Sequence, residues 1–161
     1  MDHRRRGGAG RTCRDVAGCQ ADGMMTRRIV VDHVSLVVTD LAAARTFYAA
    51  ALAPLGLTER GRDDAGGTGY GVEGRDDFWV GPAPSGPDDR PVTRGAHVAF
   101  AAESREQVDA FFAAVLAAGG SALVKPGVQR QYSGRYYGAF VADLDGNNIE
   151  AVFHSPEPLD D

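Results

Sequence analysis

Two histidines stand in similar apolar settings, 64 residues apart along the chain. His33 lies within 29–38 and His97 within 96–101, and both stretches are rich in β-branched and other apolar residues. Such stretches predict strands, and each is followed by a segment of helical periodicity. An imidazole inside an apolar strand costs free energy unless the ring has a partner. The repetition therefore predicts a duplicated unit that directs both rings toward one shared site.

Each half of the chain reads as a strand, a helix and then three strands. The first helix is predicted over 41–52 with Asp40 as its N-cap, and the second runs to Ala118 after a capping box of Ser104 and Gln107. A glycine-rich stretch at 61–71 predicts a hairpin connection. Further strands are predicted near 70–72, 78–80, 122–124, 136–142 and 148–153. The predicted fold class is α+β, built from two βαβββ modules.

The division into segments follows from composition. Residues 1–28 carry seven Arg against three Asp and no long apolar stretch, which predicts a disordered N-terminal tail. A basic arm for an acidic partner is the alternative, and Met24 or Met25 is a possible natural start. The single folded domain is predicted over 29–154, followed by a C-terminal tail at 155–161. Within the domain, module one is 29–81, a proline-rich linker is 82–94 and module two is 95–154.

Composition excludes several classes of protein. A chain of 161 residues with 43% hydrophobic residues can build one core, and it has no run of about 18 apolar residues to span a membrane. The net charge of −5 argues against a nucleic-acid partner. Cys13 and Cys19 both fall in the tail, so no disulfide framework is expected. We therefore expect a cytoplasmic protein without membrane or nucleic-acid partners.

A carboxylate completes a set of metal-ligand types. Glu150 stands in the apolar run 148–153, and side chains alternate across a strand, so it is predicted on the face opposite Ile149 and Ala151. His33, His97 and Glu150 would then line one cleft and suit a divalent metal with positions left open. The alternatives are a satisfied core histidine for His33 and an exposed edge position for Glu150.

Three motifs carry a resemblance to a known superfamily. They are Asp-His-Val-Ser-Leu at 32–36, Gly-Ala-His-Val-Ala-Phe at 95–100, and the stretch 139–150 that ends in Asp-Leu-Asp-Gly-Asn-Asn-Ile-Glu. The chain resembles the vicinal oxygen chelate superfamily, which includes glyoxalase I, bleomycin-resistance proteins, fosfomycin-resistance transferases and type I extradiol dioxygenases. The resemblance covers about 29–154. It implies two βαβββ modules around a metal cleft, with His33, His97 and Glu150 as ligands.

The resemblance also implies a divalent ion (Fe, Mn, Ni or Zn), a small-molecule substrate and a possible homodimer. Whether the cleft lies within one chain or between two stays open. Glyoxalase I-like enzymes carry a fourth ligand on the last strand of module one. That place falls near 78–80, where Phe-Trp-Val offers no ligand, which argues against a methylglyoxal-detoxifying activity.

Two functions remain open at this point. One is a metal-dependent enzyme of the glyoxalase or dioxygenase type, and the other is a non-catalytic protein that sequesters a small aromatic or drug-like ligand. Tyr132, Tyr136 and Tyr137 lie where a phenol can reach the cleft; Tyr132 and Tyr137 are the catalytic candidates, and strand packing is the alternative. Trp79 and Phe78 are candidates for an aromatic wall, with core packing as the alternative for Phe78.

Overall fold

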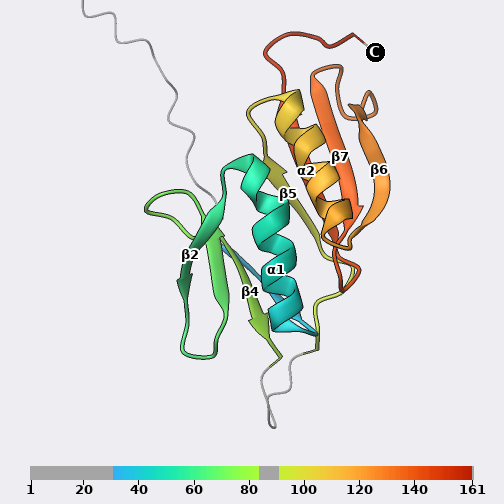
Figure 1. Ribbon diagram of the computed structural model, residues 1–161. Helices are drawn as coiled ribbons and strands as arrows, with labels where there is room; N and C mark the ends of the chain where they lie inside the picture. Colours follow the sequence, from blue (N-terminus) through green and yellow to red (C-terminus); the bar gives the residue numbers. More distant parts are fainter. Residues whose placement is uncertain (1–30, 84–90, 161) are drawn as a thin grey trace, which may run out of the picture. The chain divides into compact units, whose positions relative to one another are not determined.

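The computed structural model describes residues 31–83 and 91–160 (Figure 1). The predicted N-terminal tail, both cysteines and residues 84–90 of the predicted linker lie outside the described residues. The first half contains β1 (Val34–Val38), α1 (Leu41–Leu52), the 3-10 turn η1 (Ala53–Leu55), β2 (Thr58–Arg62), β3 (Thr68–Gly71) and β4 (Phe78–Pro82). The second contains β5 (His97–Ala101), α2 (Arg105–Ala117), β6 (Ser121–Val128), β7 (Tyr136–Ala142) and β8 (Asn148–His154).

The two halves repeat one topology. The strands of the first sheet are ordered β1-β4-β3-β2 and those of the second β5-β8-β7-β6. In each sheet the first strand runs parallel to the last strand of its module, and the other pairs are antiparallel. The predicted α+β class with two βαβββ modules is confirmed. Among the described residues, the structure contains no helix of the length and apolar character that a membrane crossing requires.

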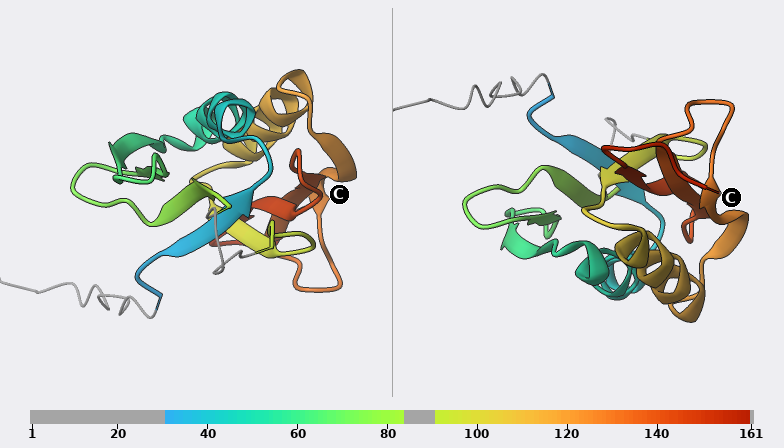
Figure 2. Two further views of the ribbon diagram at one scale, coloured as in Figure 1. Left: turned by 90° about the horizontal axis from the view of Figure 1, so that it is seen from below. Right: turned by 90° about the horizontal axis from the view of Figure 1, so that it is seen from above.

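Both modules contribute to one hydrophobic core. Helices α1 and α2 pack against each other on one side of the sheets (Figures 1 and 2). The core cluster runs from Leu36 and Val80 of module one to Phe111 and Ile149 of module two. Because side chains alternate across a strand, each sheet turns its apolar face to this core and its other face away from it.

Local signals in the sequence set the helix ends. The Asp40 carboxylate accepts a hydrogen bond of 3.0 Å from the Ala43 amide, so α1 begins at Leu41 as predicted. The Ser104 hydroxyl accepts in the same way from the amide of Gln107, which caps α2. The Gln107 side-chain oxygen accepts from the amide of Glu103. In a capping box it would accept from the amide of the N-cap residue, Ser104.

Two strands differ from the predictions. β1 begins at Val34, so His33 stands one residue before the strand rather than within it, and its side chain is exposed. Three strands were predicted after the first helix, but the position of β2 was not, because its residues are polar and largely exposed and show no apolar alternation. It forms by pairing with β3, and the turn between the two strands occupies only 63–67 of the predicted glycine-rich connection.

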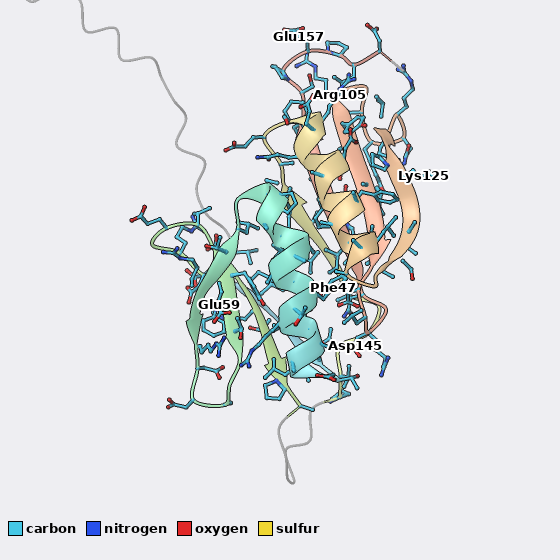
Figure 3. The ribbon with its side chains drawn as sticks, viewed as in Figure 1. Phe47, Glu59, Arg105, Lys125, Asp145 and Glu157 are labelled. Carbon is cyan, nitrogen blue, oxygen red and sulfur yellow. The ribbon has the colours of Figure 1, made fainter. Side chains whose placement is uncertain are left out.

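Hydrogen bonds join the turn before β8 to module one. The Tyr48 hydroxyl on α1 donates to the Asp143 carboxylate, which also accepts from the backbone amide and the side chain of Asn147. Asp145 of the same turn lies near the N-terminal end of α1 and accepts from the amide of Thr39 (Figure 3). These bonds fix the point from which β8 starts, and so they fix the placement of Glu150.

Candidate functional site

Glu150 occupies the middle of β8, between β5 and β7. It is paired with Ala99 on one side and Phe140 on the other, and its side chain is 1% exposed. A buried carboxylate is costly unless it is paired or hydrogen-bonded. Both of its oxygens have polar neighbours, which accounts for its position inside a largely apolar sheet.

One neighbour is the imidazole of His97 on the adjacent strand β5. Its Nε2 atom lies 3.3 Å from Oε2 of Glu150, and the ring remains 50% exposed. The ring stacks at 6.0 Å and 16° over Phe140 of β7. The structure thus brings together two of the three predicted ligands, one buried and one open to solvent.

The other neighbour is the phenol of Tyr136 on β7. Its hydroxyl donates a hydrogen bond of 2.5 Å to Oε1 of Glu150. Burial raises the pKa of Glu150, and the hydrogen bond from Tyr136 and the proximity of His97 offset part of that rise. Burial, together with the same hydrogen bond, raises the pKa of Tyr136. In this hydrogen bond the phenol is the donor and the Glu150 oxygen is the acceptor.

His33 lies in module one, away from this pair. Its Nδ1 atom is 2.9 Å from the Asp32 carboxylate. It lines a cavity of about 510 Å³ that also borders Trp79, Asp63 and Asp76. Over residues 31–83 and 91–160, no three His, Cys, Asp or Glu side chains are grouped closely enough to hold a metal ion. Within one chain, then, His33 does not join the other two predicted ligands.

The His97–Glu150 pair itself suits a divalent ion. Ligand bonds of about 2.0 to 2.2 Å place two adjacent donors of one ion roughly 3 Å apart, close to the observed spacing. An imidazole nitrogen and a carboxylate oxygen are donor types that Fe, Mn, Ni and Zn accept. The donor set fits such an ion, and the described part of one chain supplies two protein ligands at this point.

The three tyrosines proposed for acid–base work have different environments. Tyr137 points to the opposite face of the sheet, where its hydroxyl donates to Asp109 of α2 at 2.9 Å. Tyr132 is 59% exposed, and its ring lies 4.9 Å from that of Tyr136. Only Tyr136 of these three contacts Glu150. The β7–β8 register explains this, because Phe140 pairs with Glu150 and even-numbered residues of β7 share its face.

In module one, Trp79 takes the place that Glu150 holds in module two. Glu150 pairs with the residue two positions after His97, and Trp79 pairs with Ser35, two positions after His33. A Cβ at Gly69 would lie 2.7 Å from the indole, so the ring lies against the backbone of β3. The structure therefore has an aromatic wall at this place in module one, while Phe78 is buried in the core.

The comparisons with known proteins agree with this architecture. The family model of the Glyoxalase/Bleomycin resistance protein/Dioxygenase superfamily matches residues 30–151. The chain belongs to this superfamily. A search of curated proteins finds no match.

Solved structures of this superfamily are similar to the chain. A glyoxalase/bleomycin resistance protein from Albidiferax ferrireducens T118 is 33% identical, with a TM-score of 0.66, covering 76% of this chain and 97% of that one. A family enzyme from Burkholderia phytofirmans PsJN is 17% identical, with a TM-score of 0.60 and coverages of 77% and 98%. A glyoxalase-related enzyme from Fulvimarina pelagi is 20% identical, with a TM-score of 0.60 and coverages of 76% and 86%. The latter two show the fold alone.

Proposed function

We propose that this protein is a divalent-metal-dependent enzyme of the glyoxalase or dioxygenase type, acting on a small substrate through two neighbouring oxygens. The observation that carries the proposal is the pair formed by His97 Nε2 and Glu150 Oε2, 3.3 Å apart, with the carboxylate buried in an apolar sheet. Packing alone does not explain why a carboxylate is buried beside an exposed imidazole, because burying such a group costs free energy. The pair is suited to hold an ion at the surface of the sheet.

The third ligand in this proposal is His33 of a second copy of the chain. Support comes from the position of His33, which is exposed in the other module and borders its own cavity. A twofold dimer would place module one of each copy against module two of the other, completing two equivalent sites at once. The homodimer is therefore part of the proposed function.

The bound ion would supply Lewis acidity, stabilising negative charge that develops on the chelated oxygens. His97 and Glu150 would hold it with one nitrogen and one oxygen, and His33 would add a second nitrogen. Trp79 replaces a second carboxylate in module one, so a proton transfer by a glutamate at that place is not part of the proposal. The substrate would instead meet an indole there.

Metal analysis of protein purified without added metal tests the ligands. Stoichiometric Fe, Mn, Ni or Zn that disappears in His97→Ala and Glu150→Gln supports the proposal. Mixing His33→Ala with Glu150→Gln chains tests the dimer: a mixed dimer then has one intact site and one doubly altered site. Metal binding that returns on mixing supports a shared site, while no metal in wild-type protein contradicts the proposed function.

A second candidate, a binding protein without turnover, is favoured by the module-one cavity. Its volume of about 510 Å³ and the Trp79 wall suit a planar aromatic ligand. Trp79 is the only tryptophan of the chain, so its fluorescence reports on this cavity directly. Saturable quenching by 2-naphthol in metal-free protein, combined with an absence of bound metal, would favour the binder over the enzyme.

A further inference from the structure

We infer that Tyr136 is a positioning residue that holds one oxygen of Glu150, so that only the other oxygen is free to meet an ion beside His97. This inference rests on the proposed function, since it concerns which oxygen of Glu150 faces the metal. It assigns a specific task to Tyr136, which the sequence placed near the cleft but did not select as a catalytic candidate.

The two carboxylate oxygens of Glu150 have different partners. Oε1 accepts the hydrogen bond from the Tyr136 hydroxyl at 2.5 Å, and Oε2 lies 3.3 Å from Nε2 of His97. A hydrogen bond to an ionised acceptor is short and strong compared with one between neutral groups. The phenol therefore fixes the rotation of the carboxylate and directs Oε2 toward the imidazole.

The sheet leaves a gap in which this hydrogen bond forms. Tyr136 pairs with His154, so its phenol must reach along the sheet past Gly138 to meet Glu150. A Cβ at Gly138 would lie 3.0 Å from Oε1 of Glu150 and 3.0 Å from the Tyr136 ring. Any side chain at 138 would press on both partners, so glycine at this position keeps the path open.

Aromatic neighbours hold the Tyr136 ring in place. The imidazole of His154 lies edge-on to it at 5.0 Å, and the tilted Tyr132 ring lies 4.9 Å away. These contacts restrict the ring's rotamers, so the hydroxyl is preorganised toward Oε1 rather than free to bond water. Groups of this kind, which orient a ligand without touching the ion, tune both its affinity and its geometry.

With Oε1 held by Tyr136, Glu150 would bind an ion through one oxygen, Oε2. A carboxylate that binds through one oxygen occupies one coordination position, and one that binds through both occupies two. Holding Oε1 away from the ion would leave a further position for a chelating substrate. Without the phenol, Oε1 is free to swing toward the ion.

Cobalt(II) titration of Tyr136→Phe tests the inference, because the intensity of the d–d bands falls as the coordination number rises. Tyr137→Phe is the matched control: it makes the same change one residue away, on the opposite face of the sheet. We expect Tyr136→Phe to weaken Co²⁺ binding by about 10- to 100-fold and to alter the d–d spectrum. Tyr137→Phe should leave affinity and spectrum at wild-type values. Thermal melting of the metal-free proteins checks that both variants are folded.

The outcomes separate this inference from the proposed function. If wild-type protein binds Co²⁺ and Tyr136→Phe matches it in affinity and spectrum, the positioning role is overturned while the metal site stands. Equal losses in Tyr136→Phe and Tyr137→Phe would indicate general destabilisation and would also overturn it. If wild-type protein binds no Co²⁺, the proposed metal site fails and this inference fails with it.

Discussion

The hydroxyl of Tyr48 on α1 donates a hydrogen bond of 2.6 Å to the carboxylate of Asp143 in the turn between β7 and β8. Both side chains are buried, and they belong to different modules. Asp143 also accepts from the amide of Asn147, whose own side-chain oxygen accepts from the amide of Ala96 ahead of β5. The bond therefore links the first helix to the strand pair that carries His97 and Glu150.

Removing this hydroxyl should destabilise the protein. Tyr48→Phe keeps the ring but leaves a buried carboxylate oxygen with one donor fewer, which costs about 1 to 3 kcal/mol. The free energy of unfolding in urea measures the loss. Tyr137→Phe removes a less buried hydroxyl that also bonds an aspartate, and we expect it to lose less than half as much. Equal stability of Tyr48→Phe and wild-type protein would show that the link is energetically neutral.

Stability should fall steeply in alkaline solution. Burial raises the pKa of Tyr48 above the usual range, and the Asp143 carboxylate adds to the rise; burial also raises the pKa of Tyr70 to about 12. Unfolded tyrosine ionises near pH 10, so the unfolded chain loses these protons first. The associated stability is complete below about pH 10 and is lost progressively above it.

Urea unfolding at pH 8, 9.5, 10.5 and 11 tests this pH dependence. Tyr48→Phe and Tyr70→Phe should each show a shallower decline than wild-type protein. Tyr132→Phe, which removes an exposed phenol, should keep the wild-type slope. A stability that stays constant up to pH 11 would contradict the assignment.

A methyl group at position 69 should displace the indole of Trp79. The Cβ of Gly69→Ala would lie 2.7 Å from the ring, so the ring must move toward solvent. We expect a red shift in tryptophan emission and weaker quenching by 2-naphthol. Gly61→Ala is the matched control, because Gly61 pairs with Gly69 on the neighbouring strand and has open space around its Cβ position. Identical spectra for the two variants would refute this placement of the indole.

Metal should stabilise the folded protein through Glu150. A divalent ion present at 100 times its Kd adds about 2.7 kcal/mol to the free energy of unfolding when it binds only the folded state. Thermal unfolding with Mn²⁺, Ni²⁺ or Zn²⁺, compared with the same protein in EDTA, measures the effect. Glu150→Gln keeps the size of the side chain but loses the charge, and it should abolish the shift. A shift of unchanged size in Glu150→Gln would place the ion elsewhere.

Local signals account for the parts of the fold that were predicted from sequence. Asp40 caps the start of α1, and apolar alternation identifies β8 with Glu150 on the polar face. The polar strand β2 shows no such alternation. Its strand conformation follows from backbone pairing with β3, which its own side chains do not indicate. The choice between Tyr136 and Tyr137 likewise required the register of β7 against β8. A repeat in sequence identifies His33 and His97 as equivalent, but it does not say which faces of the two modules meet.

The shared core makes each module depend on the other for burial of its apolar side chains. Phe78 of module one contacts Phe100 of module two edge-on at 5.1 Å, and buried residues from both modules form one continuous cluster. Either module alone would expose its share of that apolar surface to water. We therefore expect a chain cut between the modules to aggregate or to pair with a complementary half rather than to fold by itself.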